Sequence, residues 1–267
     1  MKNKVFIESD ITSWYNHARK GGIKMINLIK RRLDAILHWN ISFVGGFLGG
    51  YAILSHAGVF GSAQTGNLME MASNVRFMEW EELGLRLLAM VIFACGVIAS
   101  YLLTNYTNLH MRKLAIWVDA AGLGLTALLP DWFAPIFFCS AFQWGVYSGA
   151  DGFNSATVFI TNNFKQSVLG WTQYALTKDK EFKRKAVLYS NTVLMFFLGA
   201  LLGVTGVAAF GNALGACVGF IPLAVARIFI SIGELPVEDE TPEETEEEAE
   251  EMLEEAKILE KEEKKKI

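Results

Sequence analysis

Long stretches without a charged residue constrain the fold of this 267-residue chain more than any other feature. Between Asp34 and Glu70 lie 35 uncharged residues, residues 87–111 form a second run of 25, and residues 186–226 form a third run of 41. A bilayer core of about 30 Å needs roughly 20 apolar helical residues to cross it. Each run is therefore long enough for one membrane span, and the third is long enough for two.

Turn-forming residues divide the remaining sequence into helices. The third run contains the turn candidate Ala208-Ala209-Phe210-Gly211-Asn212 near its middle. Another helix is expected over 114–129, stopped by Pro130, and a further one from Pro135 through Asp151 toward Phe159. The sequence thus predicts an all-α integral membrane protein with six transmembrane helices.

The charge of the chain is distributed over three regions. Residues 1–35 carry 8 basic and 3 acidic side chains, residues 36–233 carry 11 and 9, and residues 234–267 carry 5 and 16. The modest mean hydropathy of +0.29 is therefore an average of an apolar centre and two charged ends. We predict a basic N-terminal segment over 1–35, a six-helix membrane domain over 36–233, and an acidic tail over 234–267. That tail is either a solvated helix with a docking face or a frayed end.

Basic residues in the short loops predict the orientation, because such residues stay on the cytoplasmic side of a membrane. They occur at 30–32, at 112–113 and at 178–185, which are alternate loops of the six-helix arrangement. Both termini are therefore expected in the cytoplasm. The first 35 residues lack a compact apolar core followed by small residues, so no cleaved signal peptide is predicted.

An internal repeat relates the first and fourth helices, each of which continues into a polar, uncharged segment. At an offset of 96, Gly49 matches Gly145, Tyr51 matches Tyr147, Thr65 matches Thr161 and Asn67 matches Asn163. Three spans per copy would make the copies inverted in the membrane. We predict two inverted three-helix repeats, about 36–130 and about 135–233, with interrupted first and fourth helices, a pattern typical of secondary transporters.

The second and fifth helices share a surface of small residues. Phe93 and Gly96-x-x-x-Ser100 resemble Phe196 and Gly199-x-x-x-Gly203. Such spacing lets two helices approach closely. The glycines at 45, 46, 49 and 50 are likewise expected to form a packing face.

Several of these motifs resemble those of the YoaK family of bacterial six-helix membrane proteins, a domain of unknown function. The motifs are Gly46-Phe47-x-x-Gly50, Gly58-Val59-Phe60, Thr65-Gly66-Asn67, Phe142-Gln143-Trp144 and Ser155-Ala156-Thr157 to Thr161-Asn162-Asn163, and the resemblance covers about 36–232. Many relatives resemble Gly-Phe-Val-Asp-Ala, whereas the acidic position is Gly49 here. The resemblance implies the six-helix fold and the bacterial inner membrane, but no activity.

Uncharged hydrogen-bonding side chains gather at the two predicted helix interruptions and are the candidate solute-binding residues. They suit a polar neutral or zwitterionic solute, and the alternative is that they cap helix ends. They are Gln64, Thr65, Asn67, Gln143, Asn154, Thr161, Asn162 and Asn163.

Three ionisable residues are candidates for proton or ion coupling. Asp151 is expected near the middle of the fourth span, where an ionised carboxylate is costly, and is either a proton carrier or a structural partner of helix hydroxyls or of Arg227. Arg227 is expected to bind an anion, neutralise Asp151 or extend to the headgroups. His56 is expected to be the only histidine within a span. Asp119 is expected at the membrane interface or as an interhelical partner.

These features favour some classes of protein function over others. We expect a secondary transporter of a small polar solute, with a sensor or assembly scaffold acting through the charged tail as the alternative. No ATP-binding, metalloprotease or hydrolase motif occurs, so no enzyme, cofactor or metal site is predicted. Cys95, Cys139 and Cys217 lack paired spacing and are expected to pack. The expected partners are the solute and the lipid bilayer, not nucleic acid, while a cytoplasmic protein and a second copy of the chain stay open.

Overall fold

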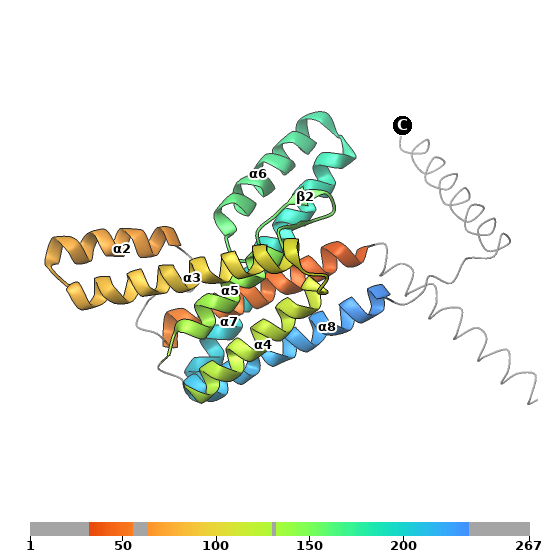
Figure 1. Ribbon diagram of the computed structural model, residues 1–267. Coiled ribbons are helices and arrows are strands. Elements are labelled where there is room, and N and C mark those ends of the chain that lie inside the picture. The colour runs from red at the N-terminus through yellow and green to blue at the C-terminus, as the bar shows by residue number, and fades with distance from the viewer. Residues whose placement is uncertain (1–31, 56–63, 130–131, 235–267) are drawn as a thin grey trace, which may run out of the picture. The chain divides into compact units, whose positions relative to one another are not determined.

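The computed structural model describes residues 32–55, 64–129 and 132–234, which are mostly helical (Figure 1). A helix over 32–55 precedes α2 (Gln64–Phe77), α3 (Trp80–Tyr106), α4 (Met111–Leu128) and α5 (Ala134–Val146). Two short antiparallel strands, β1 (Gly149–Ala150) and β2 (Phe153–Asn154), lead to α6 (Ile160–Thr177), α7 (Lys180–Val218) and α8 (Phe220–Glu234). The predicted N-terminal segment up to residue 31, the tail beyond 234 and the stretch 56–63 lie outside the described residues.

Among the described residues, two helical segments are long and apolar enough to cross a membrane. They are Trp80–Tyr106 and Lys180–Glu234, which combines α7 and α8. At about 1.5 Å per residue, the 27 residues of α3 exceed the length that a bilayer core of about 30 Å requires.

The predicted turn in the longest apolar run is confirmed. Gly211 has φ 76° and ψ 175°, outside the helical region, whereas the residues on both sides are helical. A side chain at Gly215 would lie 2.9 Å from Cα of Val207, so the segments before and after Gly211 fold back on one another. Glycine suits this position because an L side chain rarely adopts positive φ.

The helix over 32–55 lies at the centre of the packing. Every residue from 41 to 52 except Phe43 is buried, as expected of a helix that is surrounded by others. Its side chains Ile41, Phe47 and Tyr51 join the apolar core that also includes residues of α4, α5 and α8. This central position explains why residues 41–52 carry no charge on any side of the helix.

Close backbone contacts confirm the predicted small-residue packing surfaces. A Cβ at Gly46 would lie 2.8 Å from the carbonyl carbon of Phe196, and a Cβ at Gly199 would lie 2.7 Å from that of Phe43. The 32–55 helix and α7 therefore touch backbone to backbone. The predicted small-residue surface around Gly96 is also a packing face. A Cβ at Gly96 would lie 2.7 Å from Cβ of Ala141, which places α3 directly against α5.

The predicted course of the fourth helix through Asp151 is wrong. The helix α5 ends at Val146, and Asp151 with Gly152 forms the turn between β1 and β2. Both residues have positive φ, 57° and 82° respectively. Asp-Gly is a preferred pair for two-residue hairpin turns, and this local preference ends the helix despite the surrounding apolar residues. The predicted start at Pro135 and the predicted helix over 114–129, observed as α4, are confirmed to within three residues.

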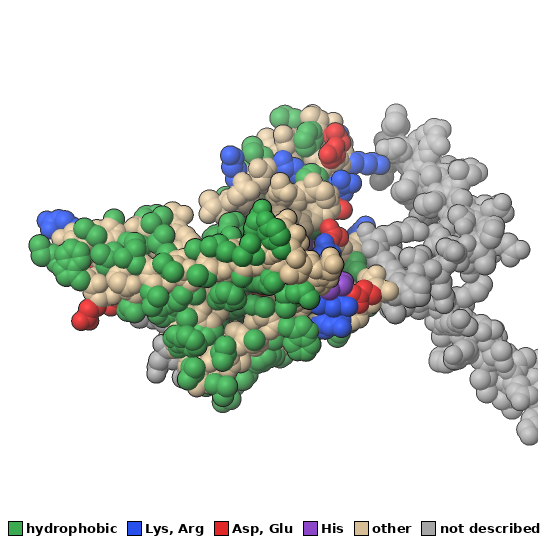
Figure 2. Space-filling view, viewed as in Figure 1, with side chains coloured by type: hydrophobic (Ala, Val, Ile, Leu, Met, Phe, Trp, Pro, Cys, Tyr) green, Lys and Arg blue, Asp and Glu red, His purple; other side chains and the backbone are tan. Residues whose placement is uncertain are grey.

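Apolar side chains cover much of the surface of the described chain. Figure 2 shows them spread over α2 and α3, and large side chains such as Met69, Phe77, Trp80 and Val91 are more than half exposed. Charged groups meet near Asp34 of the 32–55 helix, the start of α4 and Glu234 of α8. There Arg112 binds Asp34, and Lys113 binds Glu234 at 2.6 Å.

Candidate functional site

A buried chain of polar side chains joins the 32–55 helix to the start of α6. Nε2 of His38 lies 2.9 Å from the hydroxyl of Ser155, which donates to Oδ1 of Asn163 at 3.3 Å. The amide of Asn163 donates to the carbonyl of Ala156 at 2.6 Å. All three polar side chains are at most 2% exposed. The segment after β2 is thereby held between two helices by hydrogen bonds.

Gln143 extends this cluster from the last turn of α5. Its Nε2 donates to the carbonyl of Ile41 at 3.1 Å and to the hydroxyl of Thr157 at 3.2 Å. Gly45 makes room for this arrangement, since a Cβ there would lie 3.2 Å from Nε2 of Gln143. We name His38, Gln143, Ser155, Thr157 and Asn163 the buried polar cluster.

Two atoms of the buried polar cluster have no hydrogen-bond partner in the part of the chain that the structure describes. They are Nδ1 of His38 and Oε1 of Gln143. Leaving a buried polar group unpaired costs roughly 1–3 kcal/mol, and such groups are rare in native proteins. Because the Ser155 hydroxyl donates to Asn163, Nε2 of His38 is the donor to Ser155, and Nδ1 of the neutral ring is then an acceptor, as is Oε1 of Gln143. The cluster therefore has two unused acceptors.

A second set of polar groups lies between α2 and α3. Asn67 is fully buried, and its amide donates to Oε1 of Gln64 at 3.5 Å. Arg86 is also buried, with its Nη2 3.7 Å from Oε2 of the half-exposed Glu70. Nε and Nη1 of Arg86 and Nε2 of Gln64 have no partner within the described chain. This interface presents unused donors, in contrast to the buried polar cluster.

The other predicted solute-binding residues lie outside these two sets. Each is exposed, and the carbonyl of Asn154 accepts from the hydroxyl of Tyr189. They are Thr65, Asn154, Thr161 and Asn162. The structure thus gathers only Gln143 and Asn163 into the buried polar cluster, and Gln64 and Asn67 into the interface of α2 and α3.

Asp151 and Arg227, predicted to couple proton or ion movement, pair with different residues in the structure. The carboxylate of Asp151 is exposed on its turn and lies 3.4 Å from Nε of Arg184, and its backbone N–H donates to Asp34. The partner is therefore Arg184, not Arg227. Arg227 is half-buried and donates to Ser231 on its own helix. His56 lies outside the described residues.

Sequence reasoning missed three members of the buried polar cluster and one buried carboxyl. His38 lies within the 32–55 helix and was not among the candidates, whereas the expectation for His56 falls outside the described residues. Ser155 and Thr157 belong to a motif that carries the family resemblance, which is a signal that could have identified them. Asp119, expected at an interface or with a partner, is fully buried in α4 with both carboxylate oxygens unpaired among the described residues.

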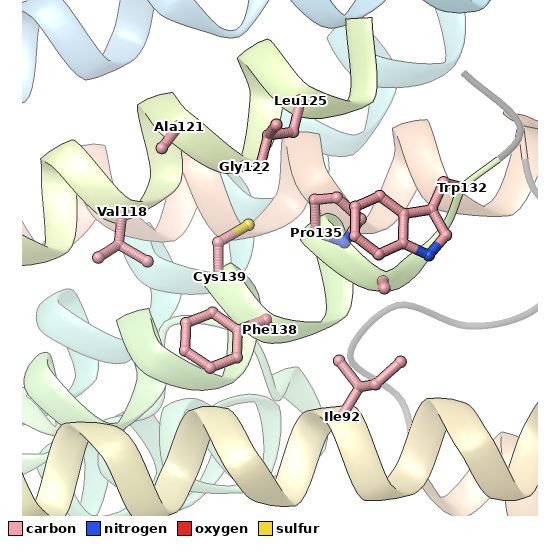
Figure 3. Close-up of a pocket in the computed structure, with 10 residues that line it drawn as sticks. Ile92, Val118, Ala121, Gly122, Leu125, Trp132, Pro135, Phe138 and Cys139 are labelled. Carbon is pink, nitrogen blue, oxygen red and sulfur yellow. The ribbon is translucent and has the colours of Figure 1, made fainter. Parts of the chain in front are cut away.

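An apolar cavity of about 420 Å³ lies between α3, α4 and α5 (Figure 3). Its lining contains no charged or amide side chain, so it offers nothing to hold a polar solute. No group of three or more His, Cys, Asp or Glu side chains in the described ranges is placed to hold a metal ion. The lining residues are Ile92, Val118, Ala121, Gly122, Leu125, Trp132, Ala134, Pro135, Phe138 and Cys139.

Comparison with known proteins gives one match. A family model described as "Protein of unknown function (DUF1275)" matches residues 37–227. No curated protein and no solved structure matches the chain. The matched region contains the whole buried polar cluster, the interface of α2 and α3, and Asp119.

Proposed function

The chain belongs to the DUF1275 family, and from this premise we propose that it is a multi-pass membrane transporter of a small polar solute. We also propose that it is of the YoaK type and works without an enzymatic step. The family's description assigns no activity, so the support comes from the chain's own residues.

The described helices support a location within the membrane. Their exposed surfaces carry many large apolar side chains, which a protein in water rarely displays over such an area. The paired charges of Asp34, Arg112, Lys113 and Glu234 mark one end of the helices, where a headgroup region would solvate them. In the proposal this end faces the cytoplasm of a bacterium, both termini lie there, and the chain crosses the inner membrane six times.

The order of the helices supports an inverted repeat. A short helix followed by a longer one occurs twice, as α2 with α3 and as α6 with α7. The offset of 96 that aligns the sequence motifs pairs Asn67 of α2 with Asn163 of α6, and both side chains are fully buried. Two equivalent halves are the arrangement that alternating access uses in many transporters.

The buried polar cluster is the observation that supports a solute-binding site. Its residues come from the central helix, from the end of α5, from the non-helical segment before α6 and from the first turn of α6. Irregular backbone at membrane depth is tolerated where it is buried in protein or lines a cavity, and transporters bind solutes at such places. The unpaired Nδ1 of His38 and Oε1 of Gln143 both accept hydrogen bonds and suit a small uncharged or zwitterionic solute that offers two donors. We propose that this solute pairs with both atoms.

The test uses the full chain in lipid vesicles with a panel of amino acids, sugars and polyols. Bound solute raises the midpoint of thermal unfolding, by an amount that grows with concentration. We expect one solute class to stabilise the wild type and to enter the vesicles. Gln143→Leu, which keeps the side-chain size and removes the amide, should lose at least tenfold in solute affinity. Asn162→Leu changes the same type of group at an exposed position, and should leave affinity unchanged.

Equal loss of affinity in the two variants would contradict a site at the buried polar cluster. If no solute class binds or moves, the transporter proposal is wrong. Function that requires residues 235–267 while solute has no effect would favour the alternative, a sensor or scaffold that acts through its charged tail.

A further inference from the structure

The buried face of α4 is apolar except for two side chains. Its buried residues recur at helical spacing and are Ala115, Ile116, Asp119, Gly122, Leu123 and Thr126. Thr126 satisfies its hydroxyl by donating to the carbonyl of Gly122 at 2.8 Å. Asp119 has no such solution, because both of its oxygens are buried and unpaired among the described residues. It is the one described carboxyl that is fully removed from solvent.

The neighbouring helix α5 runs antiparallel to α4 on this face. At one end the hydroxyl of Tyr147 donates to the carbonyl of Arg112 at 2.8 Å. Toward the other end, a Cβ at Gly122 would lie 2.8 Å from Sγ of Cys139, and Figure 3 shows Cys139 beside Gly122 between the two helices. Asp119 lies between these two contacts along α4. Tyr147 and Cys139 are therefore the ionisable groups of α5 nearest to it, and both are neutral at ordinary pH.

The charged groups on the other helices that pack nearby are engaged elsewhere. On the 32–55 helix, Asp34 binds Arg112 and His38 binds Ser155. On α8, Glu234 binds Lys113 and His110, and Arg227 binds Ser231. On α7, Tyr189 donates to Asn154, and Cys217 is exposed. No cation of the described chain is paired with Asp119.

An ionised carboxylate in these surroundings would lack water, a counter-ion and a hydrogen-bond donor. Its burial would be far more costly than that of the neutral acid. Within a membrane protein, an ionisable group kept under such conditions marks a functional position by default. A protonated Asp119 removes the charge and leaves a small polar group.

We propose that Asp119 is the proton-binding site of this protein. In the described state the carboxyl group holds a proton. When α4 and α5 separate and water reaches the group, the O–H bond breaks, the proton passes to water, and the carboxylate keeps the electron pair. This inference rests on the proposed transport function. It assigns proton coupling to Asp119 instead of to the exposed Asp151.

The first test is infrared spectroscopy of the full chain in lipid vesicles. A protonated carboxyl has a carbonyl stretching band that shifts when deuterium replaces hydrogen. We expect Asp119→Asn to remove one such band and Asp119→Glu to shift it. Asp151→Asn makes the same change at an exposed, paired carboxylate, and should leave the band in place. A band that persists in Asp119→Asn would overturn the proposal.

The second test separates coupling from transport. With a pH gradient across the vesicles, Asp119→Asn should lose at least tenfold in gradient-driven uptake, while solute exchange without a gradient continues. Gradient-driven uptake by this variant at the wild-type rate would refute the coupling role. If the wild type moves no solute, the transport proposal fails by itself, and the infrared band still decides whether Asp119 holds a proton.

Discussion

Replacing Gly46 by alanine adds one methyl group at a backbone-to-backbone contact between the 32–55 helix and α7. The new Cβ would lie 2.8 Å from the carbonyl carbon of Phe196 and nearer still to its oxygen. Ordinary carbon contacts are about 3.5–4.0 Å, so the two helices must separate by roughly 1 Å. The atoms to be moved are backbone, which no side-chain rotation can relieve.

Such a separation weakens every other contact along the same interface. A gap of about 0.5–1 Å forfeits a quarter to a half of the dispersion energy at each pair of atoms. Gly50 and Gly203 lie on the same interface, where a Cβ would meet backbone atoms at 2.8 Å, so their contacts open as well. Overpacking costs about 1–3 kcal/mol, and we expect Gly46→Ala to lie at the upper end, near 3 kcal/mol.

The assay is denaturant unfolding of the purified chain in mixed micelles, with Gly84→Ala as the matched control. Gly84 is helical and has no atom within 4 Å of an added Cβ, so alanine there should stabilise by up to about 1 kcal/mol. Equal stabilities of the two variants would refute the backbone-to-backbone contact. Function should fall with stability in Gly46→Ala and stay unchanged in Gly84→Ala.

Three further outcomes are expected in the same unfolding assay. Gly211→Ala should cost about 1–2 kcal/mol because φ is 76° at this turn, whereas Gly124→Ala, inside a helix with one distant contact at 3.9 Å, should not destabilise. Asp151→Asn should change the free energy of unfolding by less than about 0.5 kcal/mol, because asparagine also tolerates positive φ and the carboxylate is exposed. A larger loss would show that the ion pair with Arg184 contributes to stability. Arg86→Met should be neutral or stabilising by about 1–3 kcal/mol, since it removes buried unpaired donors and leaves a half-exposed Glu70; strong destabilisation would contradict this account.

Local sequence signals predicted three boundaries among the described helices. The turn at Gly211, the start of α5 at Ala134 and the end of α4 before Pro130 follow from glycine and proline, whose backbone preferences act over a few residues. The end of α5 was predicted wrongly although its signal is also local. The pair Asp151-Gly152 favours a hairpin turn, but the surrounding apolar residues obscured it.

The candidate site was predicted only in part. Gln143 and Asn163 were expected at helix interruptions, and both lie in the buried polar cluster. His38 was not expected there, because its partner Ser155 is 117 residues away in the chain. A contact over that separation depends on how the helices pack, and no pattern within one helix reveals it.

Asp119 and Asp151 show which properties the sequence determines and which ones only the tertiary structure decides. Charge-free runs, turn residues and small-residue spacing determine by themselves that the chain forms apolar helices, where α4 ends, where α5 begins and that the chain turns at Gly211, because those properties depend on neighbours along the chain. Which carboxyl is buried depends on which helix face meets another helix. Only the tertiary structure places Asp151 on an exposed turn beside Arg184 and buries Asp119 of α4 against neighbouring helices, with no partner among the described residues.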